Sequence, residues 1–299
     1  GLDVSGATRS ERHQWQLPFP VLGDEMKLVA ESLGLSQAGE VLVFNPERMS
    51  LFYRGGTDAA LNERLMAVID DDASDTVTAD VTGCAIEYTD LARHKESPPD
   101  YSTEVALIVA ENCAICHRWG GAGPFPFDSY VSLLGWSPMV REVILNKRMP
   151  PMQVDPEAGT SANAHAISAT ERQKLLHWME AGAPRGEGEV DPLELIPLEK
   201  EFDWQLGEPD FIVESPTNIV PAVGIQDYEY LEVELPFEEE KWVRAFQYSP
   251  GDERVLHHLM TFVIAPDEDF WGPEKTKKTA ERRFLGSFIP GENPATVFP

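Results

Sequence analysis

Cys113-Ala114-Ile115-Cys116-His117 is a C-x-x-C-H stretch, and it decides which module the middle of the chain forms. This spacing lets two thiols add to the two vinyl groups of one haem while the next imidazole ligates the iron. A thioredoxin-type C-x-x-C needs no His directly after it. A structural zinc site needs a second Cys/His pair, and the only other cysteine is Cys84. The stretch therefore predicts one covalent haem c on Cys113, Cys116 and His117, with a redox dithiol or structural zinc as alternatives.

A sixth iron ligand is expected later in the chain. Met149 lies in Arg148-Met149-Pro150-Pro151, where two prolines fix a rigid, non-helical loop suited to holding a thioether against a metal. Met/His is a standard low-spin ligation of haem iron, so Met149 is the preferred ligand. The other candidates are the thioethers of Met139 and Met152 and the imidazole of His165, which would give a bis-His haem.

Composition and charge restrict the surroundings of the protein. Its 51 acidic and 24 basic residues give a net charge of −27, which argues against nucleic acid or an anionic membrane as a partner. No apolar run approaches membrane-spanning length, and the first residues do not read as a signal peptide. Because haem is attached in this way outside the cytoplasm, we expect an exported, periplasmic or extracellular protein with a redox partner protein.

Changes in periodicity divide the chain into segments. Residues 1–90 are expected to form an α/β segment and a linker, 100–186 the haem module, 187–203 a second linker and 204–299 an antiparallel β-sandwich. The expected helices cover 24–33, 58–69 and 168–181, where Gly182 ends the last one. The expected strands cover 41–44, 51–54, 211–213, 228–235, 242–248 and 255–264.

The β region contains a second candidate metal site at His257-His258. Adjacent strand residues point to opposite faces, so both rings reach one metal only through a bulge or a strong twist. Copper suits imidazole ligands. The competing interpretation is one buried and one exposed structural histidine, the buried ring lying among Leu256, Leu259 and Phe262.

The order of these segments resembles a bacterial family in which a redoxin, a cytochrome c and a copper type II, ascorbate-dependent monooxygenase-like module are fused. The redoxin resemblance rests on Leu17-Pro18-Phe19-Pro20-Val21-Leu22 and Glu40-Val41-Leu42-Val43-Phe44. The cytochrome resemblance rests on 113–117, Pro124-Phe125-Pro126-Phe127, 148–151 and Gly182-Ala183-Pro184-Arg185-Gly186. The copper resemblance rests on Leu206-Gly207-Glu208-Pro209-Asp210, His257-His258 and Pro290-Gly291-Glu292-Asn293-Pro294.

The resemblance implies a multi-domain fold: a partial thioredoxin-like α/β segment, an all-α class I-like cytochrome c module and the first sandwich of the copper domain. In that family the adjacent histidines supply two of three imidazoles to one copper, and the remaining ligands come later in sequence. His257 and His258 are therefore expected copper ligands of an incomplete site, and both ends of the chain are expected to be cut from a longer polypeptide.

The function implied is an oxidoreductase whose haem relays single electrons to copper, which hydroxylates an unknown small-molecule or peptide substrate. The alternative is a periplasmic electron-transfer cytochrome with a non-catalytic β-sandwich that serves for binding. Residues 1–72 are expected to lack thiol chemistry, because the redoxin match begins after the position of the family's active cysteines. Individual catalytic residues are not identifiable from the sequence.

Overall fold

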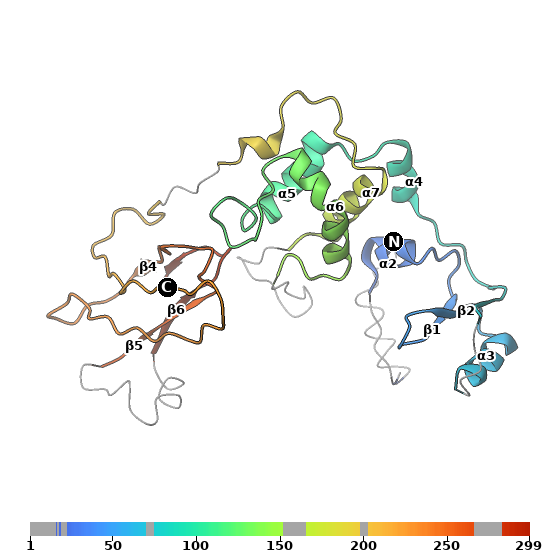
Figure 1. Ribbon diagram of the computed structural model, residues 1–299, viewed down its shortest axis with the longest axis horizontal. Coiled ribbons are helices and arrows are strands. Elements are labelled where there is room, and N and C mark those ends of the chain that lie inside the picture. The colour runs from blue at the N-terminus through green and yellow to red at the C-terminus, as the bar shows by residue number, and fades with distance from the viewer. Residues whose placement is uncertain are drawn as a thin grey trace. The chain divides into compact units, whose positions relative to one another are not determined.

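The computed structural model describes residues 16, 18, 23–69, 75–151, 166–197, 203–265 and 283–299. These residues form a mixed α/β structure with six α-helices and three small sheets (Figure 1). Their contacts define two compact units: residues 1–99 with 169–181 form unit 1, and residues 100–168 with 182–299 form unit 2. The module boundaries expected from the sequence stay predictions.

Across the described parts of the chain, no helix combines the length and the apolar character needed to cross a membrane.

Unit 1 begins with the single 3-10 turn η1 (Glu25–Lys27) and the short helix α2 (Leu28–Ser32). The helix expected over 24–33 is therefore interrupted, because Met26 and Lys27 adopt left-handed backbone angles, with φ of 56° and 58°. The carboxylate of Asp24 accepts hydrogen bonds from the backbone N–H groups of Val29 and Ala30, both at 2.9 Å. It satisfies donors that have no partner inside the helix.

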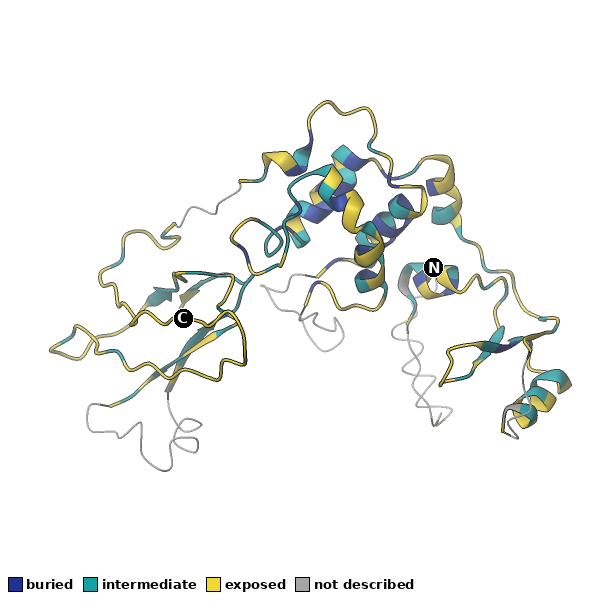
Figure 2. Ribbon diagram, in the orientation of Figure 1, coloured by how far each residue is buried: buried dark blue, intermediate teal, exposed yellow. Residues whose placement is uncertain are grey.

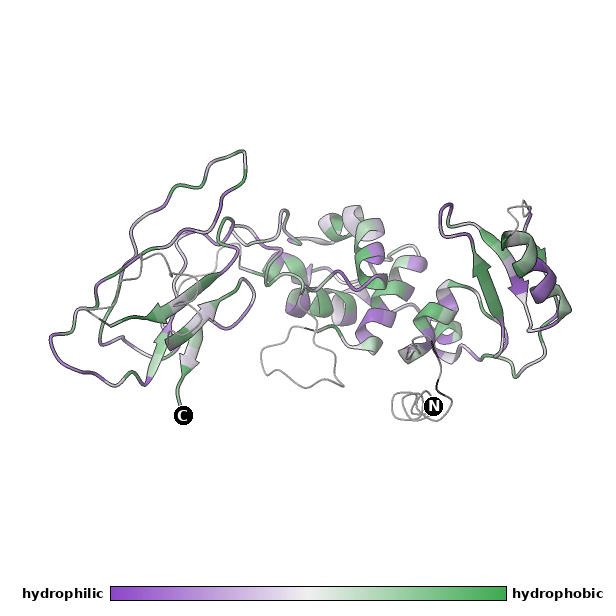
Figure 3. Ribbon diagram, turned by 90° about the horizontal axis from the view of Figure 1, so that it is seen from below, coloured by the Kyte–Doolittle hydropathy of each residue, from purple (hydrophilic) through white to green (hydrophobic). Residues whose placement is uncertain are grey.

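The small sheet of unit 1 follows. It contains β1 (Val41–Phe44), β2 (Leu51–Gly55) and β3 (Val77–Thr78), and β2 runs antiparallel to β1 and parallel to β3. The helix α3 (Ala59–Ile69) comes after β2. The runs Val-Leu-Val-Phe and Leu-Phe-Tyr are hydrophobic along the strands (Figure 3), which suits half-buried strands. The expected strands at 41–44 and 51–54 and the helix at 58–69 are confirmed.

Two further helices complete unit 1: α4 (Thr89–Glu96) and α7 (Ala169–Glu180). Leu175, Leu176 and Trp178 of α7 are buried, as the apolar pattern of this segment predicted. Gly182 follows with a positive φ of 86°, a conformation that glycine adopts at little cost after a helix. The sequence assigned α7 to the haem module, whereas its contacts group it with residues 1–99.

The helical part of unit 2 alternates buried and exposed residues (Figure 2), and its buried residues include Tyr101, Val105 and Leu133. It contains the π-helical turn η2 (Tyr101–Val105), α5 (Ala106–Asn112), α6 (Tyr130–Leu145) and the 3-10 turn η3 (Pro192–Leu195). The carboxylate of Asp191 accepts hydrogen bonds from the Tyr101 hydroxyl and the Tyr130 backbone N–H, so it ties η3 to η2 and α6. This buried contact belongs to a segment that the sequence assigned to a linker.

The β part of unit 2 consists of two antiparallel strand pairs. In the first, β4 (Ala245–Gln247) pairs with β7 (Ala295–Val297), and in the second β5 (Leu259–Val263) pairs with β6 (Arg283–Phe288). The Phe246 ring of β4 lies over Gly286 of β6, where an added Cβ would be 2.3 Å from the ring. The Tyr248 hydroxyl also donates to Thr261 of β5 at 2.7 Å. The two pairs therefore pack against each other as two small layers.

Several expected strands are absent from the described residues. The segments 211–213 and 228–235 contain no strand, and 242–248 and 255–264 shorten to 245–247 and 259–263. Most side chains of 211–235 are exposed, including Ile212, Ile219, Val223 and Ile225. An apolar run becomes a strand only where a neighbouring strand takes up its backbone hydrogen bonds, and neither run is assigned to a strand among the described residues.

Candidate functional site

The Cys113–His117 stretch begins at the C-terminal end of α5. The Cys113 N–H donates to the Val109 carbonyl at 2.9 Å, and the Cys113 carbonyl accepts from the Cys116 and His117 N–H groups at 3.2 and 2.9 Å. These bonds fold the stretch into a tight turn on the helix end. The turn gathers two thiols and one imidazole within five residues, as haem attachment requires.

The imidazole of His117 is held by a backbone carbonyl. Its Nδ1 lies 3.0 Å from the carbonyl oxygen of Phe125, and the Phe127 N–H donates to the carbonyl of His117 at 2.8 Å. A carbonyl oxygen can only accept, so Nδ1 carries the proton and Nε2 presents its lone pair. This tautomer and orientation are those that an iron-ligating histidine needs.

Aromatic side chains surround this imidazole. The rings of Phe125 and Phe127 lie 4.8 and 5.1 Å from the His117 ring, measured between centroids. Phe125 stacks on Trp136 of α6, with centroids 4.0 Å apart and planes 9° apart. The Pro-Phe-Pro-Phe string thus supplies apolar walls of the kind that limit water around a haem and tune its potential.

Two glycines bring the following loop close to the attachment turn. A Cβ on Gly123 would lie 2.8 Å from Cγ and Nδ1 of His117, and one on Gly121 would lie 2.4 Å from the Cys116 carbonyl oxygen. Real side chains do not approach this closely. A side chain at either of these two positions would therefore displace the imidazole of His117 or the turn that carries the two thiols.

The electrostatic environment disfavours thiolate at this turn. Burial raises the pKa of the Cys113 thiol to about 12. Burial also raises the pKa of Cys116, the charge of Glu253 adds to this effect, and Arg118 opposes it. A redox-active C-x-x-C motif works through a lowered thiol pKa, so these thiols do not have the character of a dithiol catalyst. Burial likewise lowers the pKa of His117, which keeps its ring neutral and able to ligate a metal.

The residues of the turn fit a covalent haem c: two thiols, a neutral imidazole with Nε2 presented, apolar walls and a glycine-lined approach. Of the candidate sixth ligands, Met149 lies directly after α6 and is 41% exposed. Met139 lies on α6, three residues after Trp136, which places both on one side of the helix. Met152 and His165 lie outside the described residues. Met149 therefore stays the predicted ligand.

His257 and His258 lie in the segment before β5, not inside a strand. Their Nδ1 atoms are 2.8 Å apart and their ring centroids 5.1 Å apart. The expected proximity of the two rings is confirmed, but the expected reason is wrong: without strand geometry the side chains need not alternate, so no bulge is required. The irregularity of β5 falls later, between Thr261 and Phe262.

The separation of the two Nδ1 atoms suits a copper ion as well as a direct hydrogen bond. Two imidazole nitrogens at about 2.0 Å from a metal in neighbouring positions of a square-planar site are about 2.8 Å apart. His257 is exposed and His258 is half-buried, with the Tyr228 ring 5.7 Å from its own. Among the residues with described positions, however, no three His, Cys, Asp or Glu side chains gather as a metal site.

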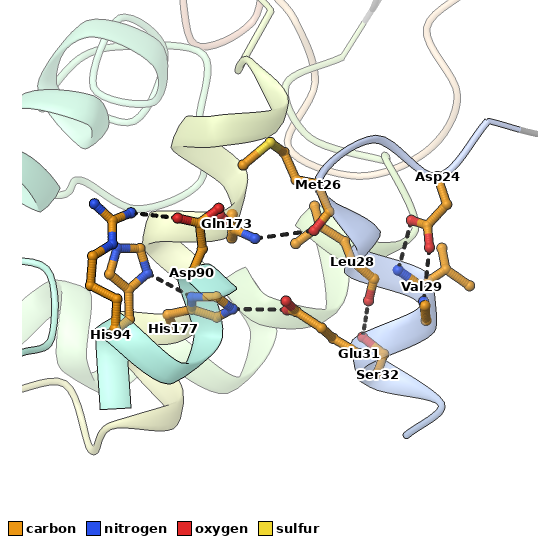
Figure 4. Close-up of polar contacts among 12 residues, drawn as sticks. Asp24, Met26, Leu28, Val29, Glu31, Ser32, Asp90, His94, Gln173 and His177 are labelled. Carbon is orange, nitrogen blue, oxygen red and sulfur yellow. Dashed lines mark hydrogen bonds and ion pairs between the residues drawn. The ribbon is translucent and has the colours of Figure 1, made fainter. Parts of the chain in front are cut away.

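A second histidine pair, His94 and His177, was missed by the sequence reasoning. In unit 1 the buried rings of His94 on α4 and His177 on α7 approach with their Nδ1 atoms 2.7 Å apart (Figure 4). Nε2 of His177 lies 2.8 Å from the carboxylate of Glu31 on α2, and Gln173 donates to the Met26 carbonyl at 3.1 Å. The available signal was His177 itself, a polar ring between the apolar residues Leu176 and Trp178.

Comparison with family models, with curated proteins and with solved structures gives no match for this chain.

Proposed function

We propose that this protein is a haem c-containing, copper-dependent oxidoreductase, in which the haem would relay single electrons, two per turnover, to a copper site that uses dioxygen to hydroxylate a C–H bond of a small-molecule or peptide substrate, with the second oxygen atom leaving as water. The observation that carries the proposal is the bond between His117 Nδ1 and the Phe125 carbonyl at 3.0 Å. It leaves Nε2 as the ligand atom, directly after two half-buried thiols whose pKa values are raised. The same turn is a poor fit to thiol redox catalysis.

Each residue of the site would have a separate role. Cys113 and Cys116 would tether the haem through thioethers, His117 would ligate the iron through Nε2, and Met149 would supply the sixth ligand. When bound, the haem supplies reversible one-electron chemistry. Phe125, Phe127 and Trp136 would exclude water from the imidazole side. His257 and His258 would bind copper through Nδ1, the atoms that already approach to 2.8 Å.

A second candidate is an electron-transfer cytochrome whose β part binds a redox partner protein without copper. The observation in its favour is that the described residues bring only two imidazoles together near β5, fewer than a stable copper site uses. Both candidates need haem attachment, which places the protein in the periplasm or outside the cell.

The test is to produce the protein in cells equipped for cytochrome c maturation, and to measure covalent haem on a denaturing gel together with iron and copper content. We expect one covalent haem per chain, and loss of it in Cys113→Ala and Cys116→Ala. Cys84→Ser is the matched control, because Cys84 is exposed and lies outside the turn. Haem-free protein from such cells would refute both candidates.

Copper content separates the two candidates. The first predicts copper that disappears in the double variant His257→Ala/His258→Ala while haem content is unchanged. The second predicts haem without copper in either protein, with electron transfer to a partner protein still intact.

A further inference from the structure

Within unit 2, a turn of the β part lies on the Cys113–His117 turn. Gly291 has φ of 90° in a turn that the Glu292 N–H closes by donating to the Ile289 carbonyl at 3.1 Å. A Cβ on Gly291 would lie 3.0 Å from Sγ of Cys116 and 3.7 Å from Ile115. Pro290-Gly291 thus has the sequence and backbone of a type II turn, and its glycine allows close contact with the haem-attachment cysteine.

An ion pair joins the same two regions. Nη2 of Arg118 lies 2.5 Å from Oε2 of Glu253, and the two side chains are only 13% and 20% exposed. Arg118 directly follows His117, and Glu253 lies in the turn that leads into β5. Because both charges are largely removed from water, losing one partner leaves the other without compensation, which is far more costly than losing a surface pair.

The neighbouring pair shows the contrast. Arg254 and Asp252 also form an ion pair, at 2.6 Å, but their side chains are 68% and 37% exposed and lie two residues apart in one turn. Exposed pairs of this kind contribute little to stability because solvent screens them. Arg254 is therefore a matched control for Arg118 and Glu253.

The position of Glu253 links this contact to both candidate metal sites. His257 is the fourth residue after Glu253, so their Cα atoms are at most about 14 Å apart. The Glu253 carboxylate pairs with Arg118, which directly follows His117 in the haem-attachment turn. One short segment thus touches the haem-attachment turn and continues into the histidine pair.

We propose that Arg118, Glu253 and Gly291 are positioning residues that dock the haem-attachment turn onto the β part, so that a haem tethered at Cys113 and Cys116 would be held next to the segment that leads to His257 and His258. Electron transfer between the two sites would depend on the proposed function. The docking contact itself does not depend on it. Docking would hold the haem-attachment turn at a constant distance from the histidine pair, and it would keep the Glu253 carboxylate close to any haem attached there.

Hydrogen exchange of the intact protein, with or without haem, tests the docking. In Arg118→Glu and in Glu253→Arg we expect amide exchange in residues 113–118 and 289–292 to rise about tenfold or more, because each places like charges in a largely buried contact. The double variant Arg118→Glu/Glu253→Arg should restore slow exchange in both turns. Arg254→Glu should leave both at the wild-type rate.

A pair of glycine variants gives an independent reading that does not disturb charge. Gly291→Ala should accelerate exchange in residues 113–118. Gly207→Ala is the matched control, since Gly207 has φ of 85° but nothing within 4 Å of its Cβ position, so it carries the same backbone strain without the contact. Equal effects of the two glycine variants on amide exchange in residues 113–118 would refute the docking. Wild-type exchange rates in both Arg118→Glu and Glu253→Arg would refute it as well.

The haem potential separates failure of the docking from failure of the proposed function. If haem attaches, Arg118→Gln should lower its potential by leaving the Glu253 carboxylate unpaired beside it, and Glu253→Gln should raise it. If haem attaches but neither its potential nor the amide exchange of the two turns changes in these variants, the docking is refuted and the proposed function is unaffected. Charge-dependent exchange in a protein that never acquires haem would support the docking and refute the proposed function.

Discussion

At the scale of single residues, the candidate haem site depends on one hydrogen bond and on the absence of one methyl group. The Phe125 carbonyl fixes the His117 tautomer, and Gly123 leaves room for the imidazole to reach that carbonyl. Neither feature depends on the identity of the Phe125 side chain, because the acceptor is a backbone atom. The imidazole orientation therefore rests on the path of the 118–125 loop.

Gly123→Ala should reduce covalent haem attachment, because its Cβ would fall 2.8 Å from Cγ and Nδ1 of His117 and push the ring away from the Phe125 carbonyl. Gly135→Ala is the control: it lies inside α6 with nothing within 4 Å of its Cβ position, and alanine favours helix by up to about 1 kcal/mol. Haem staining normalised to protein measures both. Equal haem content in the two variants would contradict the role of Gly123.

Met149→Ala should remove the weak thioether-to-iron absorption of the oxidised haem protein and lower its potential, because a thioether ligand favours ferrous iron. Met139→Ala should leave both properties unchanged, and so should Met152→Ala and His165→Ala. The opposite pattern, with Met149→Ala silent and one of the others altering the spectrum, would transfer the sixth ligand to that residue.

At the scale of elements, buried polar contacts decide how the helices of each unit assemble. In unit 1 the chain Glu31, His177, His94 connects α2, α7 and α4 (Figure 4). Only one proton can lie between two Nδ1 atoms 2.7 Å apart, so at least one of these rings must be neutral at that nitrogen. In unit 2, Asp191 connects η2, α6 and η3 in a comparable way.

His94→Leu should destabilise unit 1 by about 1–3 kcal/mol, because it leaves the buried Nδ1 of His177 without its partner. Arg93→Ala, one residue earlier on the same helix, should change stability by less than about 0.5 kcal/mol, since its pair with Asp90 is exposed. The stabilities of His94→Leu and Arg93→Ala can be compared by urea unfolding, monitored by far-ultraviolet circular dichroism.

Asp100 begins the helical part of unit 2, where its carboxylate accepts from the Thr103 N–H and hydroxyl, both at 2.8 Å. The Thr103 backbone bond is the main cause that lowers the pKa of Asp100. A lowered pKa in the folded state means that the carboxylate stabilises the fold above its unfolded pKa of about 3.9, and that this contribution is lost as pH falls through the folded value.

Asp100→Ala should therefore lower the free energy of unfolding by about 1 kcal/mol at pH 7, as loss of an N-cap typically does. Asp100→Asn retains an acceptor oxygen and should cost less at pH 7. The difference in free energy of unfolding between Asp100→Asn and the wild type should shrink as pH falls below about 4, where the wild-type carboxylate becomes neutral. Urea midpoints at pH 7 and pH 3 give the comparison, and a difference that grows on acidification would contradict the assignment.

At the scale of the whole molecule, the positions of the three cysteines distinguish haem attachment from thiol–disulfide chemistry. Cys84 is exposed in unit 1, whereas Cys113 and Cys116 lie in the turn of unit 2 and have raised pKa values. A dithiol cycle needs an accessible thiolate and a resolving thiol. Cys84 has no second cysteine elsewhere in residues 1–99 to serve as its resolving thiol.

The protein should accordingly show no disulfide-reductase or peroxidase turnover above that of Cys84→Ser, whether or not haem is attached. Reduction of a model disulfide at pH 7 with an excess of external thiol is a sufficient assay. Turnover that persists in Cys84→Ser but disappears in Cys113→Ala would identify the C-x-x-C as a working dithiol and contradict the haem-attachment function.

Local sequence determined those parts of the molecule whose causes lie within a few residues. The C-x-x-C-H spacing, the strands at Val41–Phe44 and Leu51–Gly55, and the helices α3 and α7 follow from neighbouring side chains and turn residues. The proximity of His257 and His258 also follows from adjacency, although these two residues lie outside the strand that the periodicity predicted over 255–264.

The tertiary structure alone decided the contacts between residues far apart in the chain. Glu31 and His177, Arg118 and Glu253, and Cys116 and Gly291 meet only because packing brings their segments together. The apolar runs at 211–213 and 228–235 show the converse, since their pattern suits a strand but neither run is a strand among the described residues. Periodicity records what a segment can form, and long-range pairing, whose energy depends on both partners, decides whether it does.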